Sequence, residues 1–316
     1  MSFSMRTNGK LLLTGEYFVT EGAVSLTLPT QLGQTLDVQI LKKTGARQLV
    51  WKSYNKNNEI WFEATFNLST FKIEEFSGAD DKEEVADTLQ NTLQQAKVLN
   101  PDFLSGEESW EAKSVLEFSR DWGLGSSSTL ITMVAEWAKV DPFVLLKSTF
   151  GGSGYDIVAA KADGPMLFQK FNGKNRWDKS NFNPAFKQHL YFVHLGKKQS
   201  SKEALVHYMV TAPEEREKPM PRITQITHDI AQYTTELEDF ENLIEEHEGL
   251  VQSIIQQPRA KELYFSDFWG QIKSLGGWGG DFVLATSNKS EEETKAYFEE
   301  KGFDTVLTYK ELIKEY

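Results

Sequence analysis

WGLGSSSTLITMVAEW, residues 122–137, is the stretch that says most about how this chain folds. Two glycines and three serines open it, and an apolar repeat follows at the spacing i, i+3, i+4, i+7: Leu130, Met133, Val134 and Trp137. This spacing is that of one face of a helix. A Gly/Ser loop that opens a helix presents unpaired N–H groups and the positive end of the helix dipole to an anion. The stretch therefore predicts a phosphate-binding loop.

Three further segments are rich in glycine: GKLLLTGEYFVTEG (residues 9–22), GGSGYD (151–156) and SLGGWGGD (274–281). The glycines of residues 151–154 allow the backbone to approach a ligand closely, and residues 276–280 offer N–H donors suited to a phosphate nest. Taken singly, each segment is also explained as an ordinary turn or helix cap. The Walker signature is absent, and Tyr155 breaks the G-x-S-x-G signature of a serine hydrolase.

The composition of the chain limits the classes of protein to which it can belong. A chain of 316 residues fits two domains, and its 40% apolar and 25% charged residues are typical of a folded protein. It has no cysteine, which excludes disulfides and thiolate chemistry. The apolar run 11–13 is too short for a signal peptide, and nowhere do 18 apolar residues follow one another. We therefore expect a cytoplasmic protein that does not enter a membrane.

The formal net charge of −12 disfavours nucleic acid as a partner, because nucleic-acid binding depends on clustered lysine and arginine. The same charge means that a phosphate site must be supplied with local cations. The candidates are Lys10, Arg120, Lys197, Lys198 and Lys202.

Hydrophobic periodicity predicts a mixed α+β protein. The first part reads as strands near 26–28 and 36–40, a hairpin of 49–52 with 60–66, a helix over 82–99 and a strand over 112–118 that leads into the Gly/Ser loop; 157–160 and 165–168 also have strand character. Residues 171–186 predict a domain crossing. Beyond it we expect strands at 190–195, 282–285 and 304–308, and helices at 222–256 and 291–301. This interleaving favours an α+β sandwich with helices on one face.

The four glycine-rich segments together match a known order. Residues 9–17, 123–128 and 276–281 resemble motifs one, two and three of the galactokinase, homoserine kinase, mevalonate kinase and phosphomevalonate kinase (GHMP kinase) superfamily. The run GSGYD, the GGD that ends the third motif and the segment GKKQSS (196–201) are most similar to the phosphomevalonate kinase branch. The resemblance implies a two-domain fold. Its N-terminal, ribosomal-protein-S5-domain-2-like domain (1–183) would bind ATP, and its C-terminal GHMP kinase domain (184–316) would be a ferredoxin-like α/β sandwich.

The resemblance also implies roles for single residues. Asp156 would accept the proton of the attacking hydroxyl, with Lys10 beside it. Ser127 would contact Mg²⁺. The ATP phosphates would be held by Gly123, Leu124, Gly125, Ser126, Ser127 and Ser128. The acceptor would be held by Gly15, Glu16, Ser153, Gly154, Lys197, Gly277, Gly279 and Gly280.

One departure from the family pattern bears on catalysis. Mevalonate kinases carry a magnesium-binding glutamate before the catalytic aspartate, whereas residues 143–150 contain no carboxylate. The metal would then rest on Ser127, Asp156 and phosphate oxygens, or would recruit Glu16. We expect a kinase that uses ATP and Mg²⁺ on phosphomevalonate. Mevalonate as acceptor, and a non-catalytic nucleotide-binding protein, remain alternatives, and a homodimer is left open.

Overall fold

The computed structural model describes residues 2–41, 47–196, 201–278 and 280–316; of residues 201–204 and 207 it describes the backbone alone. The chain divides into two compact units. Unit 1 comprises residues 1–9, 32–120 and 125–161, and unit 2 comprises 10–31, 121–124 and 162–316. Strands β1 (Ser2–Thr14) and β2 (Ser25–Leu41) therefore each contribute residues to both units. The expected boundary between residues 183 and 184 remains a prediction.

Unit 1 is built on a mixed sheet. The predicted hairpin is present as β3 (Gln48–Tyr54) and β4 (Ile60–Asn67), and β5 (Lys72–Gly78) extends it. Strand β6 (Ser109–Leu116) runs parallel to β3 and antiparallel to the second half of β2. Buried and more exposed residues alternate along β3 and β6, as expected of strands with one face on a core.

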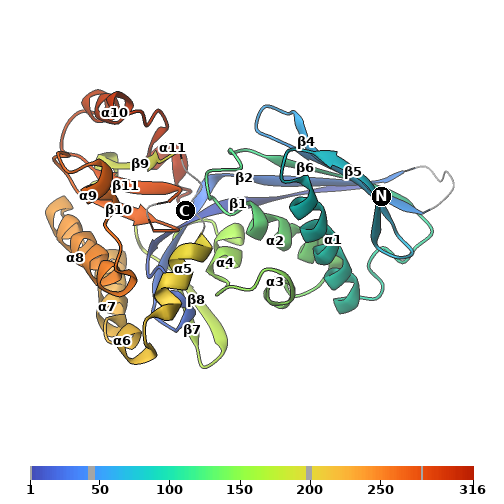
Figure 1. Cartoon of the computed structure of the whole chain (residues 1–316), viewed down its shortest axis with the longest axis horizontal. Coiled ribbons are helices and arrows are strands. Elements are labelled where there is room, and N and C mark those ends of the chain that lie inside the picture. The colour runs from blue at the N-terminus through green and yellow to red at the C-terminus, as the bar shows by residue number, and fades with distance from the viewer. Residues whose placement is uncertain (1, 42–46, 197–200, 279) are drawn as a thin grey trace. The chain divides into compact units, whose positions relative to one another are not determined.

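Helices α1 (Lys82–Leu99), α2 (Ser126–Ala138) and α3 (Pro142–Thr149) gather on one side of this sheet (Figure 1). A short helix, α4 (Tyr155–Lys161), follows α3. The shared core joins aromatic residues of the sheet to apolar residues of the helices: Trp51, Phe62, Phe66, Leu89, Leu93, Met133, Val134 and Ile157. Helix α2, which carries the expected phosphate loop at its start, is thus anchored by its apolar face.

Unit 2 contains a second sheet in the order β10-β11-β9-β12, antiparallel throughout. Its strands are β9 (Leu190–His194), β10 (Ile272–Leu275), β11 (Phe282–Thr286) and β12 (Val306–Thr308). The helices of this unit are α5 (Ser201–Val210), α6 (Pro213–Glu217), α7 (Met220–Gln232), α8 (Leu237–Ile255), α9 (Ala260–Tyr264), α10 (Glu291–Glu300) and α11 (Tyr309–Leu312), with short 3-10 turns η1 (Phe18–Thr20) and η2 (Lys187–His189).

Helices cover both faces of the second sheet, whereas the sequence predicted one. Val193 and Val283 pack with Phe298 of α10 on one face. Lys273 lies opposite Leu284 in the register, so its side chain points to the other face, where Glu248 of α8 lies 3.7 Å away. All five residues of β9 are buried, as in a strand covered on both sides.

One further expectation was wrong. Residues 157–160, predicted as a strand, lie in helix α4. A four-residue apolar run is compatible with either structure, and length is what usually decides between them. Asp156 therefore lies in the first turn of a helix and not before a strand.

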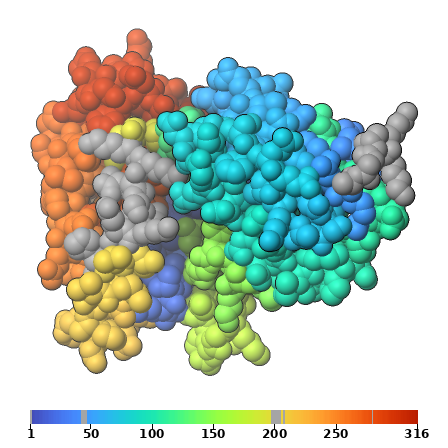
Figure 2. Space-filling model, turned by 45° about the vertical axis from the view of Figure 1, so that its right-hand side comes forward, coloured from blue at the N-terminus to red at the C-terminus, as the bar shows by residue number. Residues whose placement is uncertain are grey.

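Unit 2 also contains the hairpin of β7 (Met166–Phe171) and β8 (Lys174–Lys179), which pairs with the first half of β2 through β7. In Figure 2 this yellow-green hairpin reaches out from the surface, in agreement with the exposure of β8. Within the described ranges, no helix is both long enough and apolar enough to cross a membrane.

Candidate active site

The predicted phosphate loop ends at the start of α2. Gly125 precedes the helix with φ of 88°, and α2 begins at Ser126. No side chain of the described residues caps this helix end. The Ser128 hydroxyl donates to the Gly125 carbonyl at 2.8 Å, and Ser127 is exposed. Among the described residues, no side chain accepts a hydrogen bond from the first N–H groups of α2, so a bound anion would find these donors available.

The rest of α2 holds this end in place. The predicted apolar face is the face that packs: Met133 and Val134 are fully buried in the core of unit 1. The Trp137 ring packs edge-on against Phe103, with ring centroids 5.1 Å apart, and against Trp110 at 6.1 Å. This part of the sequence prediction is confirmed.

Residues 121–124, just before this helix, are held within unit 2. The Lys10 ammonium donates to the Gly123 carbonyl at 2.9 Å, and the Lys10 N–H donates to the Leu124 carbonyl at 2.9 Å. Gly123 has φ of +63°, and a β-carbon built on it would lie 1.9 Å from Asp281 Oδ2. The Trp122 ring packs edge-on against Phe282. Lys10 and the third motif thus both contact this part of the loop, and at Gly123 there is no room for a side chain.

Asp156 belongs to unit 1. It lies half-buried in the first turn of α4, and its Oδ1 accepts from the Ile157 N–H at 3.1 Å. The loop before it contains the predicted acceptor residues Ser153 and Gly154, both buried. The Gly151 N–H donates to the Leu146 carbonyl at 2.8 Å and closes the end of α3. The expected action of Asp156 together with Lys10, which belongs to unit 2, remains a prediction.

Within unit 2, the turn of the first motif is held by side chains that sequence reasoning missed. The Gly15 N–H donates to His247 Nε2 at 3.0 Å. Glu16 is buried, forms an ion pair with Lys273 and lies 3.4 Å from His247 Nε2. Lys273 also lies 3.7 Å from Glu248. One signal was available, because Lys273 is the one charged residue of the run IKSL at 272–275, directly before the glycines of the third motif.

Burial dominates the electrostatics of this cluster. It raises the pKa of the Glu16 carboxyl, against the opposing effect of the Lys273 ammonium. It raises the pKa of Glu248 to about 7, again with Lys273 opposing. Burial and the nearby ammonium together hold the pKa of His247 well below its ordinary value. His247 is therefore neutral, as its acceptance of a hydrogen bond from Gly15 also requires.

The other predicted acceptor residues are placed in part. Gly277 and Gly280 are buried in the turn of the third motif, where the Gly280 N–H donates to the Gly277 carbonyl at 2.9 Å. The Trp278 N–H of this turn donates to the Tyr17 hydroxyl at 2.8 Å. Lys197, Lys198 and Gly279 lie outside the described residues, and of Lys202 only the backbone is described.

The roles of Ser127 and Asp156 as Mg²⁺ ligands remain predictions, and a hydroxyl and a carboxylate are oxygen donors of the kind that this ion takes. In the described part of the chain, no three His, Asp or Glu side chains are grouped closely enough to hold a metal alone. Mg²⁺ commonly keeps waters and is held by one or two carboxylates together with substrate phosphates. The exposed Ser127 hydroxyl and the half-buried Asp156 carboxylate, both in unit 1, fit such a shared site.

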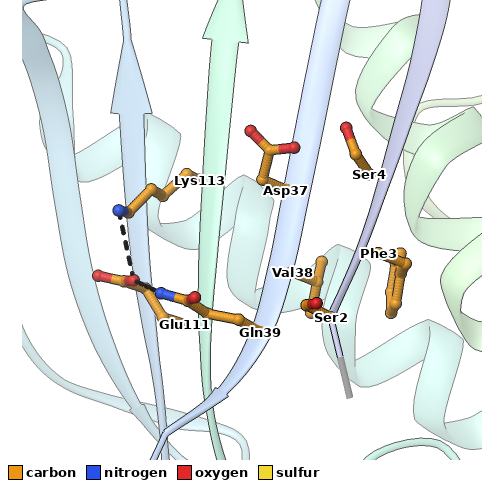
Figure 3. Close-up of a pocket in the computed structure, with 8 residues that line it drawn as sticks. All are labelled: Ser2, Phe3, Ser4, Asp37, Val38, Gln39, Glu111 and Lys113. Carbon is orange, nitrogen blue, oxygen red and sulfur yellow. Dashed lines mark hydrogen bonds and ion pairs between the residues drawn. The ribbon is translucent and has the colours of Figure 1, made fainter.

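A hollow in the surface of unit 1 lies away from the motifs. Figure 3 shows that it is lined by residues of β1, β2 and β6. The Glu111 carboxylate within it accepts from Gln39 at 2.5 Å and lies 3.5 Å from the Lys113 ammonium. None of the residues predicted to bind ATP or the acceptor lines this hollow.

Comparison with known proteins concerns the fold. The sequence matches no protein-family profile and no curated protein. Among solved structures, Methanococcus jannaschii mevalonate kinase is 16% identical, with a TM-score of 0.71 over 100% of this chain and 99% of that one. Lactococcus lactis galactokinase with galactose is 11% identical, with a TM-score of 0.68 over 97% and 92%. Streptococcus pneumoniae phosphomevalonate kinase with phosphomevalonate and AMPPNP is 15% identical, with a TM-score of 0.64 over 97% and 99%.

These neighbours belong to the GHMP kinase superfamily, which the glycine-rich motifs of the sequence resemble. The large sheet, the second antiparallel sheet and the full-length match agree with the fold expected from those motifs. The chain has the two-domain α+β fold of the GHMP kinases.

Proposed function

We propose that the protein is a cytoplasmic, ATP-dependent small-molecule kinase that transfers the γ-phosphate of ATP to phosphomevalonate. The observation that carries the proposal is the Gly/Ser loop at the uncapped start of α2, with the Lys10 ammonium bonded to the Gly123 carbonyl of the same loop. A helix end of this kind binds phosphate through its N–H groups, and the lysine adds a positive charge in an acidic protein.

Phosphoryl transfer depends on alignment and charge neutralisation more than on covalent chemistry of the protein. In the proposal, the loop of residues 123–128 holds the ATP phosphates. Asp156 orients the acceptor hydroxyl and takes its proton, and Lys10 favours the ionised form of that aspartate. Bound Mg²⁺ would neutralise phosphate charge, with Ser127 and Asp156 as its protein ligands. The proposal therefore includes the assumption that Lys10 and Asp156 act on the same hydroxyl group of the acceptor.

Phosphomevalonate is preferred as the acceptor on two grounds. The runs GSGYD and GGD are most similar to the phosphomevalonate kinase branch. One structural neighbour is a phosphomevalonate kinase bound to phosphomevalonate and AMPPNP, which supports a phosphorylated acceptor and ATP in a protein of this fold. An acceptor that already carries a phosphate needs additional cations, and Lys197, Lys198 and Lys202 are the residues proposed to supply them.

The test is a coupled assay of ADP release with Mg-ATP and four acceptors: phosphomevalonate, mevalonate, homoserine and galactose. We expect release with phosphomevalonate. Release of ADP with mevalonate alone would favour the mevalonate kinase branch, to which one structural neighbour belongs. Measurable ATP binding without release for any acceptor would instead favour a non-catalytic nucleotide-binding protein, in line with the missing carboxylate at residues 143–150.

A further inference from the structure

Four ionisable side chains are buried together behind the turn of the first motif. Lys273 and His247 have no exposed surface, Glu248 is 1% exposed and Glu16 is 4% exposed. They come from three elements of unit 2: Glu16 from the turn after β1, His247 and Glu248 from α8, and Lys273 from β10. Groups of this kind are rarely buried unless they are paired.

The contacts within the cluster are specific. The Lys273 ammonium contacts Glu16 Oε1 and lies 3.7 Å from Glu248 Oε1, and it donates to the Ser274 carbonyl at 3.0 Å. His247 Nε2 accepts from the Gly15 N–H. Lys273 is thus held on one side by the turn and on the other by α8.

A buried ion pair is weak evidence for stability, because removing two charges from water costs about as much as their attraction returns. Apolar side chains of the same size would fill this space at similar or lower cost. What such a pair supplies in addition is a fixed geometry for the backbone that carries it.

The backbone that carries Glu16 is a strained turn. Gly15 has φ of 88° and Tyr17, which has a side chain, has φ of 65°. The positive φ of Tyr17 is combined with ψ of −52°, and such a backbone conformation persists at a tyrosine only where the surroundings impose it. Here the Tyr17 hydroxyl accepts from the Trp278 N–H, and the Tyr17 ring stacks on Tyr208 with centroids 5.5 Å apart.

We propose that Glu16 and Lys273 are positioning residues, which hold the Gly15–Tyr17 turn in the conformation that receives the acceptor. Glu16 then acts through Lys273 and does not ligate Mg²⁺, in contrast to the role expected from the sequence. The inference rests on the proposed kinase function, in which this turn contributes to the acceptor site.

The test separates positioning from folding by replacing both charges. Glu16→Gln leaves Lys273 with Glu248 as its nearest remaining carboxylate, and Lys273→Met leaves Glu16 and Glu248 without their shared cation. Both variants report the cost to folding. The double variant Glu16→Met/Lys273→Met removes both charges at similar volume. At pH 6 the buried Glu248, whose pKa burial raises to about 7, keeps its proton and needs no cation, so the variant should recover most of the melting temperature at that pH. If the pair positions the turn, this folded double variant should still show a KM for the acceptor raised roughly ten- to hundredfold, with the affinity for ATP unchanged.

Amide hydrogen exchange supplies a readout that does not need turnover. Peptides covering residues 10–22 should exchange at least about tenfold faster in the double variant, because the turn opens locally. The matched control is Arg222→Met/Glu246→Met, which removes an exposed ion pair of 2.6 Å between α7 and α8. That control should change neither the acceptor KM nor the exchange of residues 10–22.

Two results would overturn the inference. One is a folded double variant with the acceptor KM and the exchange rates of the wild type, which would make the pair a filler of the core. The other is a Glu16→Gln variant that binds Mn²⁺ more weakly in its ATP complex, measured by electron paramagnetic resonance, which would make Glu16 a metal ligand. If the double variant does not fold, Glu16→Asp, which keeps both charges and shortens one arm, takes its place in both measurements. A wild type that turns over no acceptor contradicts the proposed function alone, because the exchange experiment still tests the turn.

Discussion

At the scale of single residues, Gly123 is a position of the phosphate loop with no room for a side chain. Its φ is +63°, and an added β-carbon would meet the Asp281 carboxylate. The left-handed backbone alone costs an L-residue about 1–2 kcal/mol, and the carboxylate must also move. We predict that Gly123→Ala weakens ATP binding at least about tenfold, equivalent to about 1.4 kcal/mol, as measured by titration calorimetry.

Gly302→Ala is the matched control for this variant. Gly302 has φ of +85° and nothing lies within 4 Å of an added β-carbon, so the control has the backbone cost without the collision. It should lose about 1–2 kcal/mol of stability and bind ATP as the wild type does. Equal ATP affinities for the two variants would mean that the contact between Gly123 and Asp281 does not shape the loop.

The second prediction at this scale concerns Asp156. Asp156→Asn keeps the shape of the side chain and removes its charge, so ATP should bind nearly as before. Phosphoryl transfer should slow by about 10²–10⁴-fold, the usual contribution of a general base, in a single-turnover assay. Asp163→Asn, which alters an aspartate paired with Lys314 at 3.2 Å, serves as the control. Unchanged transfer in Asp156→Asn would remove Asp156 from the catalytic role.

Single residues also show which parts of the candidate site could be predicted from the sequence. Lys10, Gly123 and Asp156 are recognisable because each lies inside a glycine-rich motif of contiguous residues. His247 and Lys273 are not, because their significance lies in contacts with Glu16, more than 200 positions away in the chain. Glu248 joins the cluster through Lys273. Glu16 was singled out as a metal or acceptor ligand, and the partner that neutralises its charge could not be read from the motif.

At the scale of elements, helix α2 has a well-packed apolar face, but the residue after its C-terminal end has an unfavourable backbone conformation. Lys139 follows the helix with φ of 55° and ψ of 45°, and its N–H donates to the Ala135 and Glu136 carbonyls. Glycine occupies such a position without steric cost. Lys139→Gly should therefore raise the free energy of unfolding by roughly 0.5–1 kcal/mol, measured in urea, with ATP affinity unchanged. Lys139→Ala keeps the steric cost and should gain nothing; a gain of the same size in both would contradict the explanation.

Elements were predictable where a long pattern defined them. Helix α1 has the bounds expected from its periodicity, and the β3–β4 hairpin lies where alternation placed it. Helix α4 was mistaken for a strand because four apolar residues fit both periods. The cover on the second face of the small sheet was also missed, since nothing local in the run 190–195 says which elements pack on it.

At the scale of the whole molecule, the compact units depend on strand pairings between segments that are far apart in the chain. The compact units are assembled from separate segments, and β1 and β2 each contribute to both. A change of composition near residues 171–186 marks a point along the chain, whereas these units follow from pairings between distant strands such as β2 with β6 and with β7. Such pairings depend on long-range closure of the chain, which local patterns do not encode.

The pH dependence of global stability is the property in which the buried cluster should be visible. The folded protein keeps a proton on Glu248 up to a pH of about 7, whereas an ordinary glutamate loses it near 4.5. Between these values the folded state binds more protons than the unfolded state, so this group lowers stability as pH rises. Glu16, whose pKa is also raised, acts in the same direction. His247 acts oppositely below about pH 6.5, because its lowered pKa leaves the unfolded state the better proton acceptor.

Glu248→Gln isolates the first of these effects by fixing the uncharged form. Relative to the wild type, this variant should gain up to roughly 3 kcal/mol between pH 4.5 and pH 8, measured by urea unfolding at several pH values. Glu246→Gln on the same helix is the control of opposite sign, because a hydrogen bond from Arg222 lowers the pKa of Glu246. That variant should lose stability relative to the wild type as pH rises through 4.5. If the free energy of unfolding changed with pH in the same way for the wild type and Glu248→Gln, Lys273 would keep Glu248 ionised over this whole range. Both carboxylates of the buried cluster, Glu16 and Glu248, would then be charged around one ammonium.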